Sequence, residues 1–205
     1  MSSLRLINIA KQFGDKVLLD GIDFEFHAGR IYIIRGESGS GKTTLLNIIA
    51  GYIEADTGRL EMQPNTRIEY LFQDEMLFSN LTARENMYIK YRARNRDDAG
   101  FLPLAEGTLA QFNILDLADR KISMLSGGEK QRVQLASILI SDPDIILMDE
   151  PTSKLDLHNK KTIYEAIVSA FHRKLVIIVS HENNRLIDAS INLTLEHGRL
   201  HDEKR

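Results

Sequence analysis

Cysteine and tryptophan are absent from this chain of 205 residues. Without cysteine there is no disulfide framework and no thiolate metal site, so the chain must be stabilised by a hydrophobic core. Basic residues are also too few to dominate: 26 lysines and arginines face 29 acidic residues, for a formal net charge of −3. This balance argues against a general nucleic-acid-binding surface and against adhesion to an anionic membrane by charge alone.

Long apolar runs are missing as well. No segment reaches the ~18 consecutive apolar residues that a membrane span requires, and the longest runs, around 145–148 and 175–179, suit buried strands. The N-terminus, Met1–Arg5, lacks the basic start and apolar stretch of a signal peptide. We therefore expect a soluble, cytoplasmic protein that needs a second, membrane-spanning chain for any action at a membrane.

Strand and helix patterns alternate along the chain. Residues 22–26 alternate apolar and charged side chains, as in a half-buried strand. The segments 4–9, 30–35, 68–72, 145–148 and 175–179 also have strand character, whereas 42–50 and 132–140 have helical character. Residues 56–58, Asp-Thr-Gly, are typical of a turn. This βα alternation predicts an α/β fold with a largely parallel sheet covered by helices.

Helical spacing dominates a central stretch that begins near Thr82. Thr82 and Glu85 have the spacing of a capping box that opens a helix. A chain of this length favours one domain, so we expect a single domain, 1–205, with a helical subdomain inserted at approximately 74–125.

A phosphate-binding pattern occupies residues 36–43, which read GESGSGKT. A buried strand precedes it and a helix follows, as the pattern requires. Its glycines allow backbone N–H groups to point inward at a phosphate, and the helix contributes its positive N-terminal end. We expect Lys42 to reach the β- and γ-phosphates and the Thr43 hydroxyl to bind Mg²⁺.

Two acids, Asp149 and Glu150, end the apolar strand 145–148. Taken alone, such a pair is more often solvated than functional. Beside a phosphate loop, Asp149 is placed to hold Mg²⁺. Glu150 can then activate a water molecule that attacks the γ-phosphate.

A second glycine-rich segment, residues 125–131, reads LSGGEKQ before a helical run. Ser126 is a natural N-cap, and the glycines expose backbone N–H groups. Physical reasoning alone leaves two alternatives open, an ordinary capped helix start and a second anion site.

This segment resembles the signature sequence of ABC ATPases. The order and approximate spacing of phosphate loop, signature and Asp-Glu strand are those of the family, and the compact subunits of the lipoprotein-release and macrolide-export type look most similar. Phe13 stands at the family's adenine-stacking aromatic, Gln73 at its metal- and water-contacting glutamine, and His181 at its γ-phosphate histidine. Residues 153–156 resemble the loop that crosses the dimer interface, with Lys154 in place of the usual alanine. The signature helix also departs from the family, with 136–138 reading Ala-Ser-Ile where an Ala-Arg-Ala type sequence is usual.

The resemblance implies a P-loop NTPase core with an antiparallel β portion near the N-terminus. It implies an ATPase that binds ATP and Mg²⁺, pairs head to tail with a second ATPase subunit, and drives a separate integral membrane subunit. The nucleotide-binding residues would be Phe13, Gly36, Ser38, Gly39, Ser40, Gly41, Lys42, Thr43 and Thr44, with Ser126, Gly127, Gly128, Glu129 and Asp156 on the signature side. The catalytic residues would be Lys42, Gln73, Glu150 and His181, and the metal ligands Thr43, Gln73 and Asp149.

Two other classes of function compete with this interpretation. One is a non-transport ABC ATPase acting on DNA, ribosomes or cofactor assembly, and the other is a small-molecule kinase. The first would carry a long coiled-coil insertion or a second set of motifs, and the second would not need the signature. The chain has neither the insertion nor a duplicated motif set.

Two surface features remain. Lys90, Arg92, Arg94 and Arg96 form a basic run, which is more typical of a solvated helix end than of a contact with a membrane partner. Residues 74–78, DEMLF, place acids beside large apolar side chains. These apolar residues are either core or a docking surface for an amphipathic helix of the membrane subunit.

Overall fold

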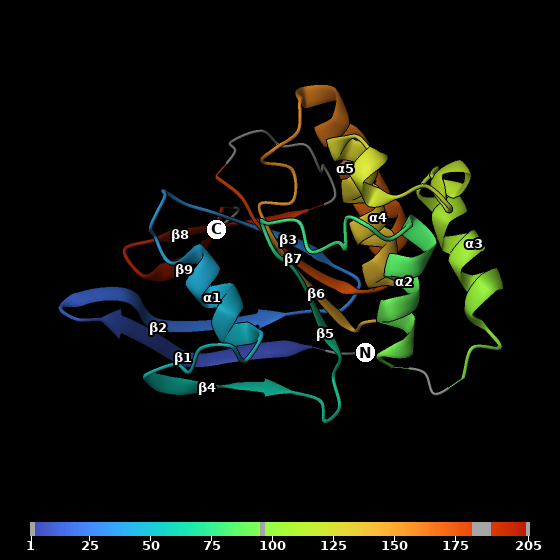
Figure 1. The fold of residues 1–205 in the computed structure, drawn as a ribbon. Helices are drawn as coiled ribbons and strands as arrows, with labels where there is room; N and C mark the ends of the chain where they lie inside the picture. Colours follow the sequence, from blue (N-terminus) through green and yellow to red (C-terminus); the bar gives the residue numbers. More distant parts are fainter. Residues whose placement is uncertain (1–2, 95–96, 182–189, 204–205) are drawn as a thin grey trace. The chain divides into compact units, whose positions relative to one another are not determined.

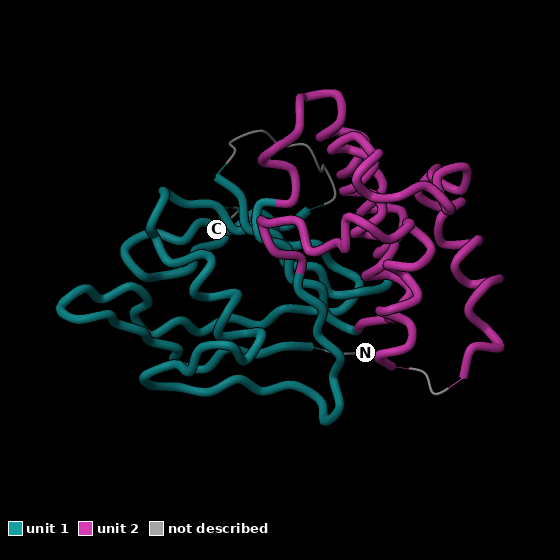
Figure 2. The backbone as a smooth tube through the Cα atoms, in the orientation of Figure 1, with its two compact units in different colours: residues 1–70, 144–150, 172–205 teal, residues 71–143, 151–171 magenta. Residues whose placement is uncertain are grey.

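A computed structural model describes residues 3–94, 97–181 and 190–203 (Figure 1). The chain divides into two compact units (Figure 2). Unit 1 comprises residues 1–70, 144–150 and 172–205, and unit 2 comprises 71–143 and 151–171. In the described ranges, no helix is both long and apolar enough to cross a membrane. Arg96, the last residue of the predicted basic run, lies outside these ranges.

Unit 1 contains two sheets. In the first, β1 (Leu4–Phe13) lies between β2 (Lys16–Phe26) and β4 (Thr57–Met62), and both pairings are antiparallel. The second has the order β5-β6-β7-β3-β8-β9, formed by Ile68–Leu71, Ile145–Asp149, Leu175–Val179, Ile31–Arg35, Ile191–Glu196 and Arg199–Asp202. Its pairs β6–β7, β7–β3 and β3–β8 are parallel, and β8–β9 is antiparallel. The predicted α/β class with a largely parallel sheet is confirmed.

The central strands of the second sheet are buried on both faces. Every residue of β3, β6 and β7 is buried, which explains their continuous apolar sequence. Helix α1 (Lys42–Ile49) follows β3, buries its leucines and isoleucines, and contacts β6. Its N-cap, Gly41, approaches Leu18 and Leu19 of β2 so closely that an added Cβ would lie 3.0 Å from each side chain. The start of α1 is therefore packed against β2 while the helix covers the sheet that precedes it.

One prediction about unit 1 needs correction, and two of its strands had no prediction. Residues Thr57 and Gly58, predicted as part of a turn, begin strand β4. Gly58 has φ +87°, and a Cβ there would lie 2.3 Å from the backbone oxygens of Ile7 and Asn8, so glycine allows β4 to pass the irregular part of β1. Strands β8 and β9 were not predicted.

Unit 2 is helical. Its helices are α2 (Ala83–Arg92), α3 (Phe101–Gln111), α4 (Gly127–Leu139) and α5 (Leu157–Phe171), with 3-10 turns η1 (Leu115–Leu117) and η2 (Ile122–Met124). Helix α2 contacts α3 and α4, and α4 contacts α5. The capping box predicted at Thr82 and Glu85 is present at the start of α2. Arg92 in the last turn of α2 pairs with Asp98 at 3.3 Å, so at least this member of the basic run has an internal partner.

Candidate active site

The phosphate loop connects β3 to α1 and depends on two glycines. Gly36 has φ +151°, and a Cβ there would lie 2.5 Å from the Leu195 carbonyl oxygen. Gly41 is left-handed, with φ +105°, and provides no side chain to cap α1. The first N–H groups of α1 therefore receive no capping side chain from the helix's own N-cap, and they form a positive end suited to an anion.

Lys42 begins α1 and lies inside the loop. The residue is only 7% exposed, and its Nζ donates hydrogen bonds to the carbonyl oxygens of Gly36 and Glu37, both at 2.8 Å. Burial lowers the pKa of the Lys42 ammonium, and attraction to Glu150 and Asp149 opposes this shift. A partly desolvated ammonium with acids nearby is a charge that a phosphate would stabilise.

Asp149 ends β6 and is buried. Burial raises the pKa of its carboxyl group, and a hydrogen bond with the Thr43 side chain counteracts part of that rise. The Tyr70 hydroxyl donates to Asp149 Oδ2 at 3.4 Å, and burial raises the pKa of that hydroxyl, so it is a neutral donor. Thr43 and Asp149 thus bring two hard oxygen ligands together.

This donor set fits Mg²⁺, which is usually held by one or two protein oxygens together with phosphate oxygens and water. In the described part of the chain, no cluster of three or more histidine, cysteine or acidic side chains could hold a metal by itself. A cation at Thr43 and Asp149 would therefore depend on the nucleotide for its other ligands.

Glu150 follows Asp149 in a left-handed conformation with φ +48°. This conformation is unusual for a residue with a side chain and is typical of strained functional positions. Its N–H donates to the Val179 carbonyl oxygen at 3.0 Å, which anchors the backbone to the end of β7. Its Oε1 lies 2.8 Å from Nδ1 of His181, so the carboxylate and the imidazole are held as a pair.

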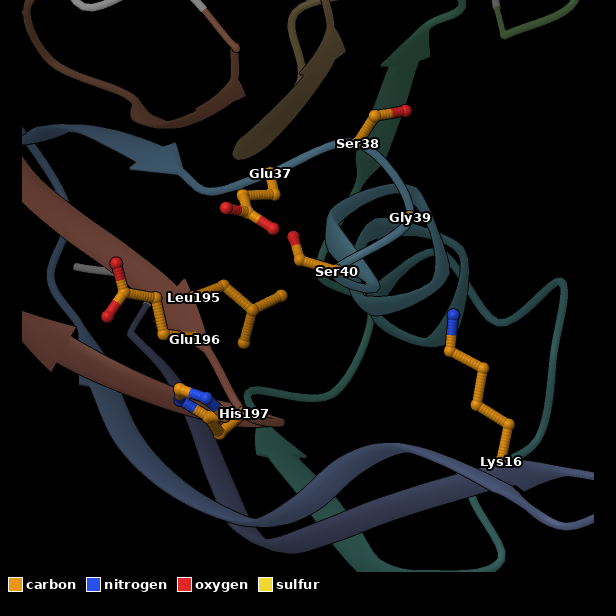
Figure 3. Close-up of a pocket in the computed structure, with 8 residues that line it drawn as sticks. All are labelled: Lys16, Glu37, Ser38, Gly39, Ser40, Leu195, Glu196 and His197. Carbon is orange, nitrogen blue, oxygen red and sulfur yellow. The ribbon is translucent and has the colours of Figure 1, made fainter.

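A cavity of about 460 Å³ borders the phosphate loop (Figure 3). Its lining consists of Lys16, Glu37, Ser38, Gly39, Ser40, Leu195, Glu196 and His197. Figure 3 shows the Lys16 side chain extending from β2 toward α1, with Glu37 and Ser40 on the loop and His197 on the β8–β9 turn. The loop therefore has an open, charged flank. Phe13, at the end of β1, is half exposed, and the Lys11 ammonium lies 5.4 Å from its ring centroid.

The remaining predicted residues belong to unit 2. Ser126 caps α4: its Oγ accepts from the Glu129 N–H at 3.4 Å, and its own N–H donates to Glu129 Oε2 at 2.7 Å. The Glu129 carboxylate accepts from the Ser126 N–H and also from the Ser126 hydroxyl, at 2.8 Å, and these two hydrogen bonds lower the pKa of Glu129. Asp156 accepts from the Asn159 N–H at 3.0 Å at the start of α5. The capped helix start that the sequence allowed at Ser126 is present.

Unit 1 thus holds Phe13, the phosphate loop with Thr43 and Thr44, Asp149, Glu150 and His181, whereas Gln73, Ser126–Glu129 and Asp156 lie in unit 2. Gln73 and Ser126 are exposed, and Gly128 is buried so close to Asn159 that a Cβ would lie 3.0 Å from its Oδ1. Sequence reasoning missed Tyr70, because a tyrosine in a short apolar strand carries no motif. It also missed Asn86, a buried amide on α2.

Comparisons with known proteins identify the family of the chain. A family model described as "ABC transporter" matches residues 19–153. The lipoprotein-releasing system ATP-binding protein LolD of Bacteroides thetaiotaomicron is 34% identical, over 93% of this chain and 96% of the relative. The zinc import ATP-binding protein ZnuC of Halorhodospira halophila is 34% identical, over 96% of this chain and 75% of the relative. The crystal structure of the ADP conformation of MJ1267, an ATP-binding cassette of an ABC transporter, matches with a TM-score of 0.85 at 26% identity, covering 98% of this chain and 89% of that chain.

Proposed function

The chain belongs to the ABC transporter family as an ATP-binding subunit that hydrolyses ATP to drive transport, and from this premise we propose how its residues do so. MgATP binding closes a head-to-tail dimer, and hydrolysis reopens it while a separate membrane subunit moves the substrate. The observation that carries the proposal is the pairing of Glu150 with His181 beside the desolvated Lys42 and Asp149.

Binding of the triphosphate begins at α1. Lys42 releases the carbonyl oxygens of Gly36 and Glu37 and turns its ammonium to the β- and γ-phosphates, while the N–H groups of Gly39–Thr44 surround the phosphates. Ser38 and Ser40 lie within the same loop. Thr43, Asp149 and Gln73 would hold Mg²⁺, which neutralises the charge that develops on the phosphate oxygens.

Hydrolysis uses the acid that follows β6. Glu150 accepts a proton from the attacking water, and His181, 2.8 Å from its carboxylate, orients that carboxylate and holds the γ-phosphate. The left-handed backbone of Glu150 and its N–H bond to Val179 hold the base in one position. Pre-positioning of this kind is where such a site gains most of its rate.

The second half of the site comes from the partner subunit. The exposed residues Ser126 and Gly127, with Gly128 and Glu129, present the start of α4, and Asp156 presents the loop before α5. We infer that these elements close over the nucleotide of the other subunit. We treat the chain as one domain, 1–205, in which approximately 74–125 is the helical subdomain.

Base recognition relies on Phe13. An exposed ring recognises a base mainly by stacking, which tolerates different bases. We therefore expect weak discrimination between ATP and GTP, measured by competition binding. A preference of ~100-fold or more would instead require hydrogen bonds to the base edge.

The conformational change of the ATPase is transmitted to the membrane subunit through residues 74–78, which we call the docking segment. Met76 and Phe78 are 67% and 59% exposed, so the core alternative does not hold for these two side chains, whereas Leu77 is half buried. We propose that an amphipathic helix of the membrane subunit covers them, and that the chain lies on the cytoplasmic face of the membrane. Met76→Glu should abolish membrane association, and Leu102→Glu, at an exposed leucine of α3, is the matched control.

The proposed chemistry is tested by ATP hydrolysis with and without Mg²⁺. Lys42→Ala removes the cation at the γ-phosphate and should lower turnover by roughly 10²–10³-fold, as loss of a transition-state contact does. Lys161→Ala, at an exposed lysine of α5, should leave turnover unchanged. Undiminished hydrolysis in Lys42→Ala would refute the assigned site.

A further inference from the structure

We propose that Asn86 is a positioning residue, which holds the docking segment on α2 and connects it to the backbone that leads into the signature segment. The inference rests on the proposed docking function of residues 74–78. It adds which residue fixes the docking segment and which backbone segment would be displaced together with it.

Asn86 is only 4% exposed and uses both ends of its side-chain amide. Its Oδ1 accepts from the Phe78 N–H at 2.8 Å, and its Nδ2 donates to the Phe78 carbonyl oxygen at 3.2 Å and to the Thr82 carbonyl oxygen at 2.9 Å. Both backbone polar groups of Phe78 are thus bound to one side chain. The end of the docking segment cannot leave α2 without breaking two hydrogen bonds and leaving a buried amide unsatisfied.

The Phe78 side chain behaves differently from its backbone. The ring is 59% exposed, although the backbone beneath it is held by a buried residue. A residue that only filled the core would bury its ring. A held backbone with a projecting ring suits a surface that presents an apolar group to a partner.

The connection continues toward the signature. Residues 79–82 pair with 121–123: the Ser123 N–H donates to the Ser79 carbonyl oxygen at 3.0 Å, and the Ile122 N–H donates to the Leu81 carbonyl oxygen at 2.9 Å. Thr82 and Lys121 form an antiparallel bridge. Ser126, the cap of α4, follows η2 by two residues. A displacement of the docking segment would therefore be carried by backbone hydrogen bonds to within a few residues of Ser126.

Hydrogen exchange of the isolated chain tests this connection without any partner. Asn86→Ala should speed exchange at the Phe78 amide on the order of tenfold, the effect of losing one hydrogen bond at a buried site. It should also speed exchange at the amides of Ile122 and Ser123. Asn80→Ala, at an exposed asparagine in the same loop, is the matched control and should change neither.

Asn86→Asp separates positioning from general destabilisation. The aspartate keeps an acceptor for the Phe78 N–H but places its second carboxylate oxygen against the carbonyl oxygens of Phe78 and Thr82. The Phe78 amide should therefore exchange more slowly than in Asn86→Ala, although the hydrogen bond to the Thr82 carbonyl is lost. If Asn86→Ala fails to fold, this variant carries the test. Unchanged exchange at Phe78 in Asn86→Ala, or a change confined to Phe78 with none at Ile122 and Ser123, would overturn the proposal.

The second readout is the fraction of each variant that co-sediments with membranes prepared from the source organism. Asn86→Ala should reduce the bound fraction several-fold, Met76→Glu should abolish binding, and Asn80→Ala should leave the bound fraction unchanged. If Met76→Glu reduces binding and Asn86→Ala does not, the positioning role is wrong. If Met76→Glu has no effect, the docking function itself is wrong, and the exchange measurement still decides whether Asn86 connects the two segments.

Discussion

Helices α1 and α4 both begin at glycine-rich segments, but the first backbone N–H groups of the two helices differ in how they are capped. Helix α1 in unit 1 has no capping side chain, because its N-cap is Gly41. Helix α4 in unit 2 has a complete capping box, in which Glu129 and Ser126 bind each other's backbone N–H groups. The first end is open to an anion within its own unit, and the second already holds a carboxylate.

Charge follows the same division. In unit 1, burial raises the pKa of Asp149 and lowers that of Lys42, so both groups are less stable in their charged forms than in water. In unit 2, hydrogen bonds lower the pKa values of Glu85 and Glu129, so their charged forms are favoured. In unit 1 the charged forms of Lys42 and Asp149 are therefore destabilised by desolvation, and a bound ligand of suitable charge can offset this cost. The helix starts of unit 2 are stable without a ligand.

The largest expected effect concerns the base in unit 1. Glu150→Gln keeps the size of the side chain but cannot accept a proton, so hydrolysis should fall by roughly 10²–10⁴-fold while ATP still binds. Single-turnover hydrolysis and equilibrium binding measure the two quantities separately. Wild-type turnover in this variant would show that unit 1 lacks the proposed base.

A smaller effect is expected at the α4 cap. Ser126→Ala removes the capping hydroxyl and should lower the free energy of unfolding by about 1 kcal/mol, in addition to impairing ATP-dependent dimerisation. Glu129→Gln retains an acceptor for the Ser126 N–H and should keep most of the stability. Urea unfolding of both variants checks the order, and equal losses would mean that the box depends on the Glu129 charge as much as on the Ser126 hydroxyl.

The pH dependence of stability should differ in sign between the units. The folded pKa of Asp149 is raised, so its ionised form destabilises the nucleotide-free protein above that pKa, and the penalty disappears as pH falls through it. Asp149→Asn should therefore be more stable than wild type at about pH 7, and the difference should shrink toward about pH 4. Glu129 has a lowered pKa, so its stabilising effect is present above about pH 4.5 and is lost as pH falls through the folded pKa. A stability gap for Asp149→Asn that grows on acidification would contradict the assigned environment.

The smallest effect is expected where unit 2 departs from its family. Lys154 pairs with Asp74 at 3.1 Å, and Lys130 of α4 pairs with Glu75 at 3.3 Å, so two lysines hold the acids that follow Gln73. Both side chains of the Lys154 pair are exposed, and such pairs contribute about 0–1 kcal/mol. A double-mutant cycle of Lys154→Ala and Asp74→Ala should give a coupling energy in that range that declines with salt. Coupling that persists at high salt would indicate a more buried contact.

The sequence predicted the phosphate-site residues of unit 1 well, but it predicted three of the strands of that unit, β4, β8 and β9, poorly or not at all. Buried strands and the phosphate loop have strong local patterns, so β3, α1, β6 and β7 and their polar ends were predictable. Strands β8 and β9 were missed, and the first two residues of β4 were predicted as part of a turn, because Gly58 lies in a strand for a tertiary reason, the close passage of β1. In unit 2 the capping box at Thr82 and the N-cap at Ser126 were predictable from the sequence, whereas the role of Asn86 depends on a loop that only the fold brings to α2. The sequence likewise could not show whether Met76 and Phe78 belong to the core or to the surface, because only their exposure in the fold decides this.

The central claim is that the open helix end of unit 1 and the capped one of unit 2 meet across two subunits with ATP between them. Sedimentation of Glu150→Gln tests it most directly, because the variant should hold ATP without consuming it. With MgATP we expect the mass of two chains, and without nucleotide, or with Lys42→Ala added, the mass of one. A variant that binds MgATP and still sediments as a single chain at high protein concentration would contradict the account.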